Sequence, residues 1–113
     1  MEIVRQNKKF YSRVFKSEHR TYRYSTGARY QGEFRGNLRH GLGKMEWPDG
    51  TTYEGLFDYN LANGQGKMIF STGDVYDGSF RSNKFYGKGV YKQKKKDSEK
   101  EYSGYWVNGM KQG

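Results

Sequence analysis

Polar and apolar side chains alternate over short stretches that recur along the chain. Residues 30–35, with the sequence YQGEFR, place a tyrosine, a glycine and a phenylalanine on one side and polar residues on the other. The stretches 43–47 and 66–70 alternate in the same way. A period of two is typical of a β-strand that buries one face. The turn sequences "PDGT" and "STGD" lie beside these stretches, so the pattern predicts antiparallel hairpins.

The pattern returns at a fixed interval. A shift of 23 residues aligns three units, and a fourth copy begins 26 residues after the third. Such a period is the signature of a repeat architecture. The units lie near residues 30–52, 53–75, 76–101 and 102–113, and the last is incomplete. Their first tyrosines are Tyr30, Tyr53, Tyr76 and Tyr102, and the rings four residues later are Phe34, Phe57, Phe80 and Trp106.

The repeating pattern Y-x-G-x-F/W, followed by G-x-G and then a D-G or T-G turn, resembles the MORN (membrane occupation and recognition nexus) repeat. The resemblance covers about residues 21–113, which we take as the repeat domain. The predicted fold is all-β, an elongated single-layer antiparallel meander of MORN-type hairpins. The resemblance implies a spacer, dimerisation or docking module, as in junctophilins, radial-spoke heads and parasite cytoskeletal scaffolds.

The glycines of the pattern have a predicted packing role. We expect each aromatic ring to lie flat across the backbone of a glycine on the neighbouring strand or two residues along, because a missing Cβ leaves room for the ring. A valine in place of Gly32 should therefore cost more than an ordinary surface substitution.

Residues 1–20 precede the repeats and differ from them. Apolar residues recur there at mostly helical spacing, with basic residues on the remaining surface, which predicts a short amphipathic helix. It either caps the first strand, because terminal repeats need protection, or docks onto a partner or a membrane surface. The apolar side of this helix contains Ile3, Phe10, Tyr11, Val14 and Phe15.

The net charge of +9 is unevenly distributed. Residues 44–66 contain one lysine and four acidic residues, whereas both ends of the chain are basic. A continuous basic stripe for a nucleic-acid backbone is therefore absent from the sequence, and we expect no specific nucleic-acid binding.

The chain has no cysteine and no apolar run of about 20 residues. These features lead us to expect a cytoplasmic protein, and the resemblance to MORN proteins implies an association with the cytoskeleton or a cilium.

The sequence contains no recognisable catalytic constellation. Its two histidines, His19 and His40, lack the converging ligands of a metal site. The glycine-rich stretch 36–44 fails the spacing of a phosphate-binding loop. We therefore predict a protein that is not an enzyme and that needs no cofactor or metal.

The stretch "YKQKKKDSEKEY" at residues 91–102 departs from the repeat. It favours an extended, solvated hairpin loop, although Lys92, Lys94, Lys95 and Lys96 are candidates for binding anionic lipid headgroups. Acidic residues follow these lysines directly, which argues against a lipid site.

Binding is the remaining class of function. We predict a non-catalytic scaffold or adaptor that binds a protein partner through its aromatic face; phosphoinositide or membrane-surface binding is the alternative. The strand at residues 102–107 should form an open edge for a second copy, a partner strand or further repeats. The candidate partner-binding residues are Tyr22, Tyr24, Tyr30, Phe34, Trp47, Tyr53, Phe57, Phe70, Tyr76, Phe80, Tyr102 and Trp106.

Overall fold

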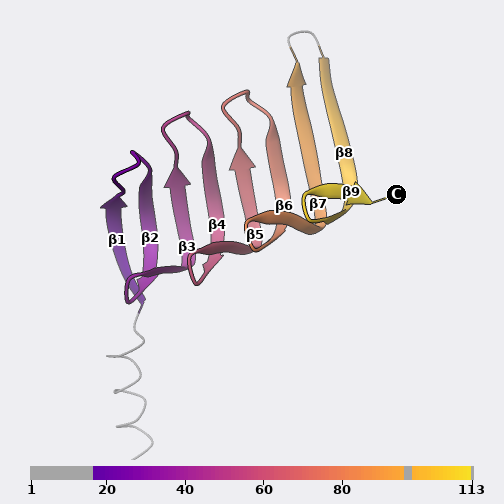
Figure 1. The fold of residues 1–113 in the computed structure, drawn as a ribbon. Coiled ribbons are helices and arrows are strands. Elements are labelled where there is room, and N and C mark those ends of the chain that lie inside the picture. Colours follow the sequence, from indigo (N-terminus) through magenta and orange to yellow (C-terminus); the bar gives the residue numbers. More distant parts are fainter. Residues whose placement is uncertain (1–16, 96–97, 113) are drawn as a thin grey trace, which may run out of the picture.

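The computed structural model describes residues 17–95 and 98–112, which form nine antiparallel strands in one open sheet, in chain order (Figure 1). This part of the chain contains no helix, so the predicted all-β, single-layer meander is confirmed. The helix expected before the repeats lies in residues 1–16, outside the described residues, whereas residues 17–20 already belong to β1. The strands are β1 Ser17–Arg23, β2 Arg29–Arg35, β3 Leu38–Glu46, β4 Thr52–Asp58, β5 Leu61–Ile69, β6 Val75–Arg81, β7 Lys84–Lys95, β8 Ser98–Val107 and β9 Met110–Gln112.

Each of the first three repeats is centred on a tyrosine that lies across a glycine. Tyr30, Tyr53 and Tyr76 are 0% exposed. In the first repeat, Gly32 pairs with Gly43 on the next strand, and a Cβ on Gly43 would overlap the Tyr30 ring. The hydroxyl groups of the three tyrosines donate to backbone carbonyls three residues later, at 2.8, 2.7 and 2.9 Å. The glycines thus provide both the space for the ring and the backbone contact beneath it.

The rings connect one repeat to the next. The centroid of the Tyr53 ring lies 5.0 Å from that of Phe57 in its own repeat and 4.9 Å from that of Phe80 in the following one, both edge to face. Tyr30 contacts Phe34 and Phe57 in the same way, at 4.9 and 5.1 Å. Edge-to-face pairs contribute about 1 kcal/mol each beyond their buried area. The core is therefore a chain of nearest-neighbour contacts, as expected for a solenoid.

The hairpin tips stack on one another through a second series of contacts. In Figure 1 these tips curl into a row along one end of the sheet. The backbone N–H of Asn60 donates to the Arg39 carbonyl at 3.0 Å, and the Asn60 Oδ1 accepts from the Arg39 N–H at 2.9 Å. Asn83 makes the same two bonds to Ala62, at 3.0 and 2.7 Å. Both asparagines have positive φ angles, 73° and 70°, which asparagine tolerates better than most residues.

We expect replacement of Asn83 by glycine to lower the free energy of unfolding by about 1 kcal/mol, because the buried N–H of Ala62 loses its acceptor while the positive φ remains available. Asn108→Gly is the matched control, since Asn108 also has a positive φ, 51°, and its side chain is exposed at the last tip. Urea unfolding of both variants measures the difference. Equal stability of the two variants would contradict a role for the stacked asparagines.

The edge predicted at residues 102–107 is paired over part of its length. Tyr105, Trp106 and Val107 of β8 pair with Gln112, Lys111 and Met110 of β9. The prediction of a wholly unpaired edge is therefore wrong. Asn108 and Gly109 have φ angles of 51° and 82° and form a two-residue turn that reverses the chain. Among the described residues, the outer side of β8 is left without a neighbouring strand at residues 98–104.

Candidate functional site

The sheet has two chemically different faces. We call the side with Tyr30, Tyr53 and Tyr76 the ring face and the opposite side the polar face. On the polar face, Glu54 lies opposite Lys44 on one neighbouring strand and opposite Lys67 on the other. The ring face instead combines the glycines with most of the aromatic side chains.

The twelve predicted binding residues separate by burial into two groups. Seven lie in the core and cannot contact a partner: Tyr30, Phe34, Tyr53, Phe57, Tyr76, Phe80 and Trp106. The remaining five are accessible to different degrees. Tyr22, Trp47 and Tyr102 are 51%, 36% and 40% exposed, and Tyr24 and Phe70 are half-buried.

Three of the accessible rings occupy the same position in successive repeats. Tyr24, Trp47 and Phe70 each begin the turn that follows a strand, and each carbonyl accepts a hydrogen bond from the turn glycine three residues later, at 2.9, 3.0 and 2.8 Å. Equivalent positions two strands apart are about 10 Å from each other. We call these three side chains the outer ring row.

The C-terminal end of the outer ring row rests on rings that the sequence did not single out. Phe70 lies 6.2 Å from Phe85 and 6.0 Å from Tyr91, centroid to centroid. Phe85 in turn stacks on Tyr76 at 3.8 Å with an interplanar angle of 5°. Tyr91 aligns with Met45 and Met68 in the 23-residue repeat. Alignment of the repeats could therefore have placed it on the ring face from the sequence.

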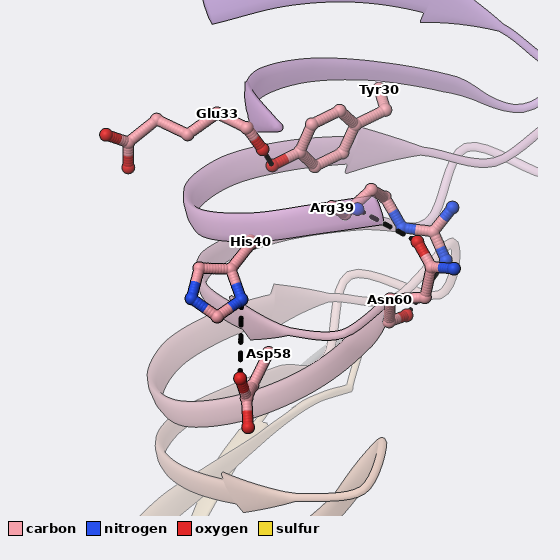
Figure 2. Close-up of polar contacts among 6 residues, drawn as sticks. All are labelled: Tyr30, Glu33, Arg39, His40, Asp58 and Asn60. Atoms are coloured by element: carbon pink, nitrogen blue, oxygen red, sulfur yellow. Dashed lines mark hydrogen bonds and ion pairs between the residues drawn. The ribbon is translucent and has the colours of Figure 1, made fainter. Parts of the chain in front are cut away.

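A cation lies among the rings at the N-terminal end of this face. The Arg39 Nη1 donates to the Tyr24 hydroxyl at 2.6 Å, and its Nη2 donates to the Asn60 carbonyl at 2.8 Å. The guanidinium lies 5.3 Å from the Tyr24 ring and 5.8 Å from the Phe57 ring. Figure 2 shows Arg39, on the same hairpin as Tyr30, beside Asn60 of the next tip. Arg39 occupies the repeat position that holds Ala62 and Phe85 in the next two units, so a cation replaces an apolar residue there. This arginine was not among the residues predicted from the sequence.

The comparison with known families identifies the repeat. The model of the MORN repeat matches residues 30–52, 53–75, 76–98 and 102–113, which is most of the chain. The chain belongs to the MORN repeat family. No curated protein matches it. MORN repeats are non-enzymatic interaction modules for proteins or membranes, and this chain contains about four of them.

The polar contacts of the MORN sheet include one histidine and carboxylate pair. The His40 Nδ1 lies 3.3 Å from the Asp58 Oδ1 (Figure 2), and the His40 ring contacts the Tyr59 ring edge to face at 5.2 Å. His19 lies on β1, on the polar face. In the described part of the chain, no three His, Cys, Asp or Glu side chains gather in a way that could hold a metal ion.

The lysine candidates for lipid binding do not form one cluster. The Lys92 ammonium lies 4.0 Å from the Glu101 carboxylate. The backbone N–H of Lys94 donates to the Asp74 carboxylate at 2.9 Å. Alternation along β7 places the Lys94 side chain on the polar face and the Lys95 side chain on the ring face. Lys96 lies outside the described residues. Within residues 17–95 and 98–112 there is no helix that is long and apolar enough to cross a membrane.

Burial changes the acidity of the MORN tyrosines. It raises the pKa of Tyr30 and Tyr76 to about 12 and also raises the pKa of Tyr53. The pKa of Tyr91 is raised to about 12, first by burial and then by the 2.7 Å hydrogen bond that its hydroxyl donates to Asp74. These hydroxyl groups therefore stay protonated, and keep donating to their acceptors, above pH 10, where an ordinary tyrosine ionises.

Proposed function

We propose that this MORN repeat chain is a non-catalytic scaffold or adaptor that binds a protein partner through its ring face. The observation that carries the proposal is the outer ring row of Tyr24, Trp47 and Phe70, which a rigid sheet holds at regular intervals. Tryptophan and tyrosine are enriched among the residues that dominate binding energy. Accessible aromatic surface of this kind usually marks an interaction site.

The sheet supports this role because it fixes the rings before a partner arrives. The strands that precede Trp47 and Phe70 pair with a neighbour on both sides, and the strand that precedes Tyr24 pairs with β2. The core tyrosines of the same face are fully buried. A partner would therefore meet a preorganised surface and pay little ordering entropy on the side of this chain.

The open edge offers a second contact. No strand of the described residues pairs with the outer side of β9 or with the outer side of residues 98–104 in β8, where a partner strand, further MORN repeats or a second copy of the chain could add. Glu99, Lys100 and Glu101 lie on this edge, and charged residues there restrict which strands can add. We propose a cytoplasmic protein in a cytoskeletal or ciliary assembly, a setting that rests on the family resemblance alone.

A pull-down with the wild type and the Trp47→Ser, Phe70→Ser double variant tests the proposal. We expect the variant to lose proteins that the wild type retains, because two rings of the outer row are removed while the buried tyrosines remain. Circular dichroism must show that the variant keeps its fold. If a folded variant retained the same set of proteins, the ring face would not be the binding surface.

Membrane-surface binding is the second candidate, because Lys94, Lys95 and Lys96 lie close together in the sequence. The scaffold proposal predicts that replacing these three lysines by glutamine changes partner binding by no more than about twofold, since exposed charges contribute little. Sedimentation with phosphatidylserine vesicles at low salt measures the alternative. Strong sedimentation of the wild type that the triple variant loses would favour the membrane.

A further inference from the structure

Basic side chains lie at both ends of the ring face. At the N-terminal end, the Arg20 guanidinium lies 4.3 Å from the centre of the Phe34 ring, and Arg39 lies beside Tyr24. At the C-terminal end, the Lys111 side chain covers Gly104, with its Cε 3.1 Å from the position of a Cβ on that glycine. Lys100 takes the same face of β8 by alternation with Tyr102.

Two of these cations occupy equivalent positions in the repeat. Arg39 lies two residues after Asn37, and Lys111 lies two residues after Gly109, which are the second residues of their turns. The middle repeats have Ala62 and Phe85 at this position. Ala62 is buried, and Phe85 packs against the core. The first and last tips therefore carry a cation at the point where the middle tips are apolar.

Acidic side chains are concentrated away from this surface. In the described strands, alternation places only Glu18 on the ring face, where its carboxylate lies 3.7 Å from the Arg20 Nε. Glu46, Glu54 and Asp77 lie on the polar face, opposite their cross-strand partners. Of the acidic residues in the turns, Asp74 also reaches this face, where its carboxylate accepts a hydrogen bond from Tyr91 at 2.7 Å. Within the described strands, the ring face thus presents aromatic rings between two basic ends, with the Glu18 carboxylate at one of them.

The N-terminal basic end also has a hollow in which a side chain could lie. A cavity of about 370 Å³ is lined by Arg20, Tyr22, Tyr24, Phe34 and Asn37. One guanidinium and several rings around a concave site suit a carboxylate on an apolar stem.

We propose that the ring face binds an acidic amphipathic segment of a partner protein, with apolar residues on the outer ring row and carboxylates at the two basic ends. This inference deepens the proposed function and rests on it. From β1 to β8 there are seven interstrand steps of about 4.8 Å, or about 34 Å, which a helix of about 22 residues spans. A protein segment fits better than a membrane because the cations are divided between two ends of a row of rings and do not form one basic patch. Arg20 on β1 and Lys100 on β8, for example, lie about 34 Å apart by this spacing.

Selection from a random peptide library displayed on phage tests the proposal with the wild-type chain as bait. We expect the selected peptides to be rich in Asp, Glu and large apolar residues. The Lys100→Gln, Lys111→Gln double variant should bind a selected peptide about fivefold more weakly and with a smaller salt dependence, since two exposed charge pairs are lost. Lys67→Gln, Lys88→Gln is the matched control: it removes the same charge from exposed residues of the polar face and should leave binding within about twofold.

Each other outcome overturns the inference. Neutral or basic selected peptides, an equal effect of the two lysine double variants, or no selected peptide at all would contradict an acidic partner. Binding to phosphatidylserine vesicles without any selected peptide would assign the basic ends to a membrane. If the Trp47→Ser, Phe70→Ser variant lost binding while the Lys100 and Lys111 changes had no effect, the proposed function would stand and this inference would fall.

Discussion

Replacement of Gly32 by valine is expected to lower the free energy of unfolding by about 3 kcal/mol or more. A Cβ on Gly32 would overlap the Cα of Gly43 on the neighbouring strand and would lie 2.6 Å from the Leu42 carbonyl oxygen. Both are backbone atoms of a paired strand, so they cannot rotate away as a flexible side chain would. Strands β2 and β3 would have to separate where the Tyr30 ring packs.

Gln31→Val is the control for this substitution. Gln31 is the preceding residue of the same strand, and its side chain is exposed on the polar face. A valine there should change stability by no more than about 0.5 kcal/mol. Urea unfolding of the two variants gives the comparison. Similar stabilities would show that the glycine pairs do not set the packing of the rings.

Alkaline conditions are expected to unfold the protein steeply above about pH 10. The pKa of Tyr30 and Tyr76 is about 12 in the folded chain, against about 10 for an unfolded tyrosine. Between these values the unfolded chain releases protons that the folded chain retains, so stability falls as the pH rises. It is fully present below about pH 10, and each such tyrosine removes about 1.4 kcal/mol per pH unit above it.

The Tyr53→Phe variant isolates one of these contributions. Burial raises the pKa of Tyr53 as well, and the variant shares all other titrating groups with the wild type. Its free energy of unfolding should therefore decrease more gently with pH, by about 1.4 kcal/mol less per pH unit between pH 10 and 12. At every pH the variant also lacks the hydrogen bond to the Leu56 carbonyl. Urea unfolding at a series of pH values measures the two slopes. Parallel slopes would mean that the Tyr53 hydroxyl is not held in its neutral form by burial.

The repeat could be derived from the sequence because local pattern and global fold agree in it. The alternation around Tyr30 and the 23-residue period predict the strands and their antiparallel order, and the structure confirms both. The G-x-G pairs similarly predict rings lying on glycines, as Tyr30 lies on Gly43. Each of these features depends on residues close in sequence or one repeat away.

Burial along the ring face could not be predicted in the same way. Alternation assigns Phe57 and Trp47 to one face but does not show how deep each lies. Their different exposure arises because the tips bend over the sheet, so that Arg39 comes within 5.8 Å of the Phe57 ring. The tip that carries Arg39 lies beyond a register shift between Gly32 and Phe34 of β2 and their partners on β3, where Gly41 has a φ of 90°. Alternation alone does not predict that shift.

The C-terminal hairpin was missed although its signal was present. The dipeptide Asn108-Gly109 favours a two-residue hairpin turn, yet only three residues of β9 follow it. The pairing covers the apolar end of β8, where Trp106 is buried and its Nε1 donates to the Gly89 carbonyl at 3.0 Å. The remaining outer side of β8 carries the charged residues 99–101.

The most direct test of the account compares the two faces of the sheet with one purified partner from the pull-down. The Trp47→Ser, Phe70→Ser variant changes the ring face, and the Leu42→Ser, Leu56→Ser variant removes two exposed apolar side chains that lie opposite each other on the polar face. Isothermal titration calorimetry should show binding weakened by at least about tenfold in the first variant, since two hot-spot rings are lost, and unchanged within about twofold in the second. Weaker binding only in the polar-face variant would contradict the ring face as the site of function.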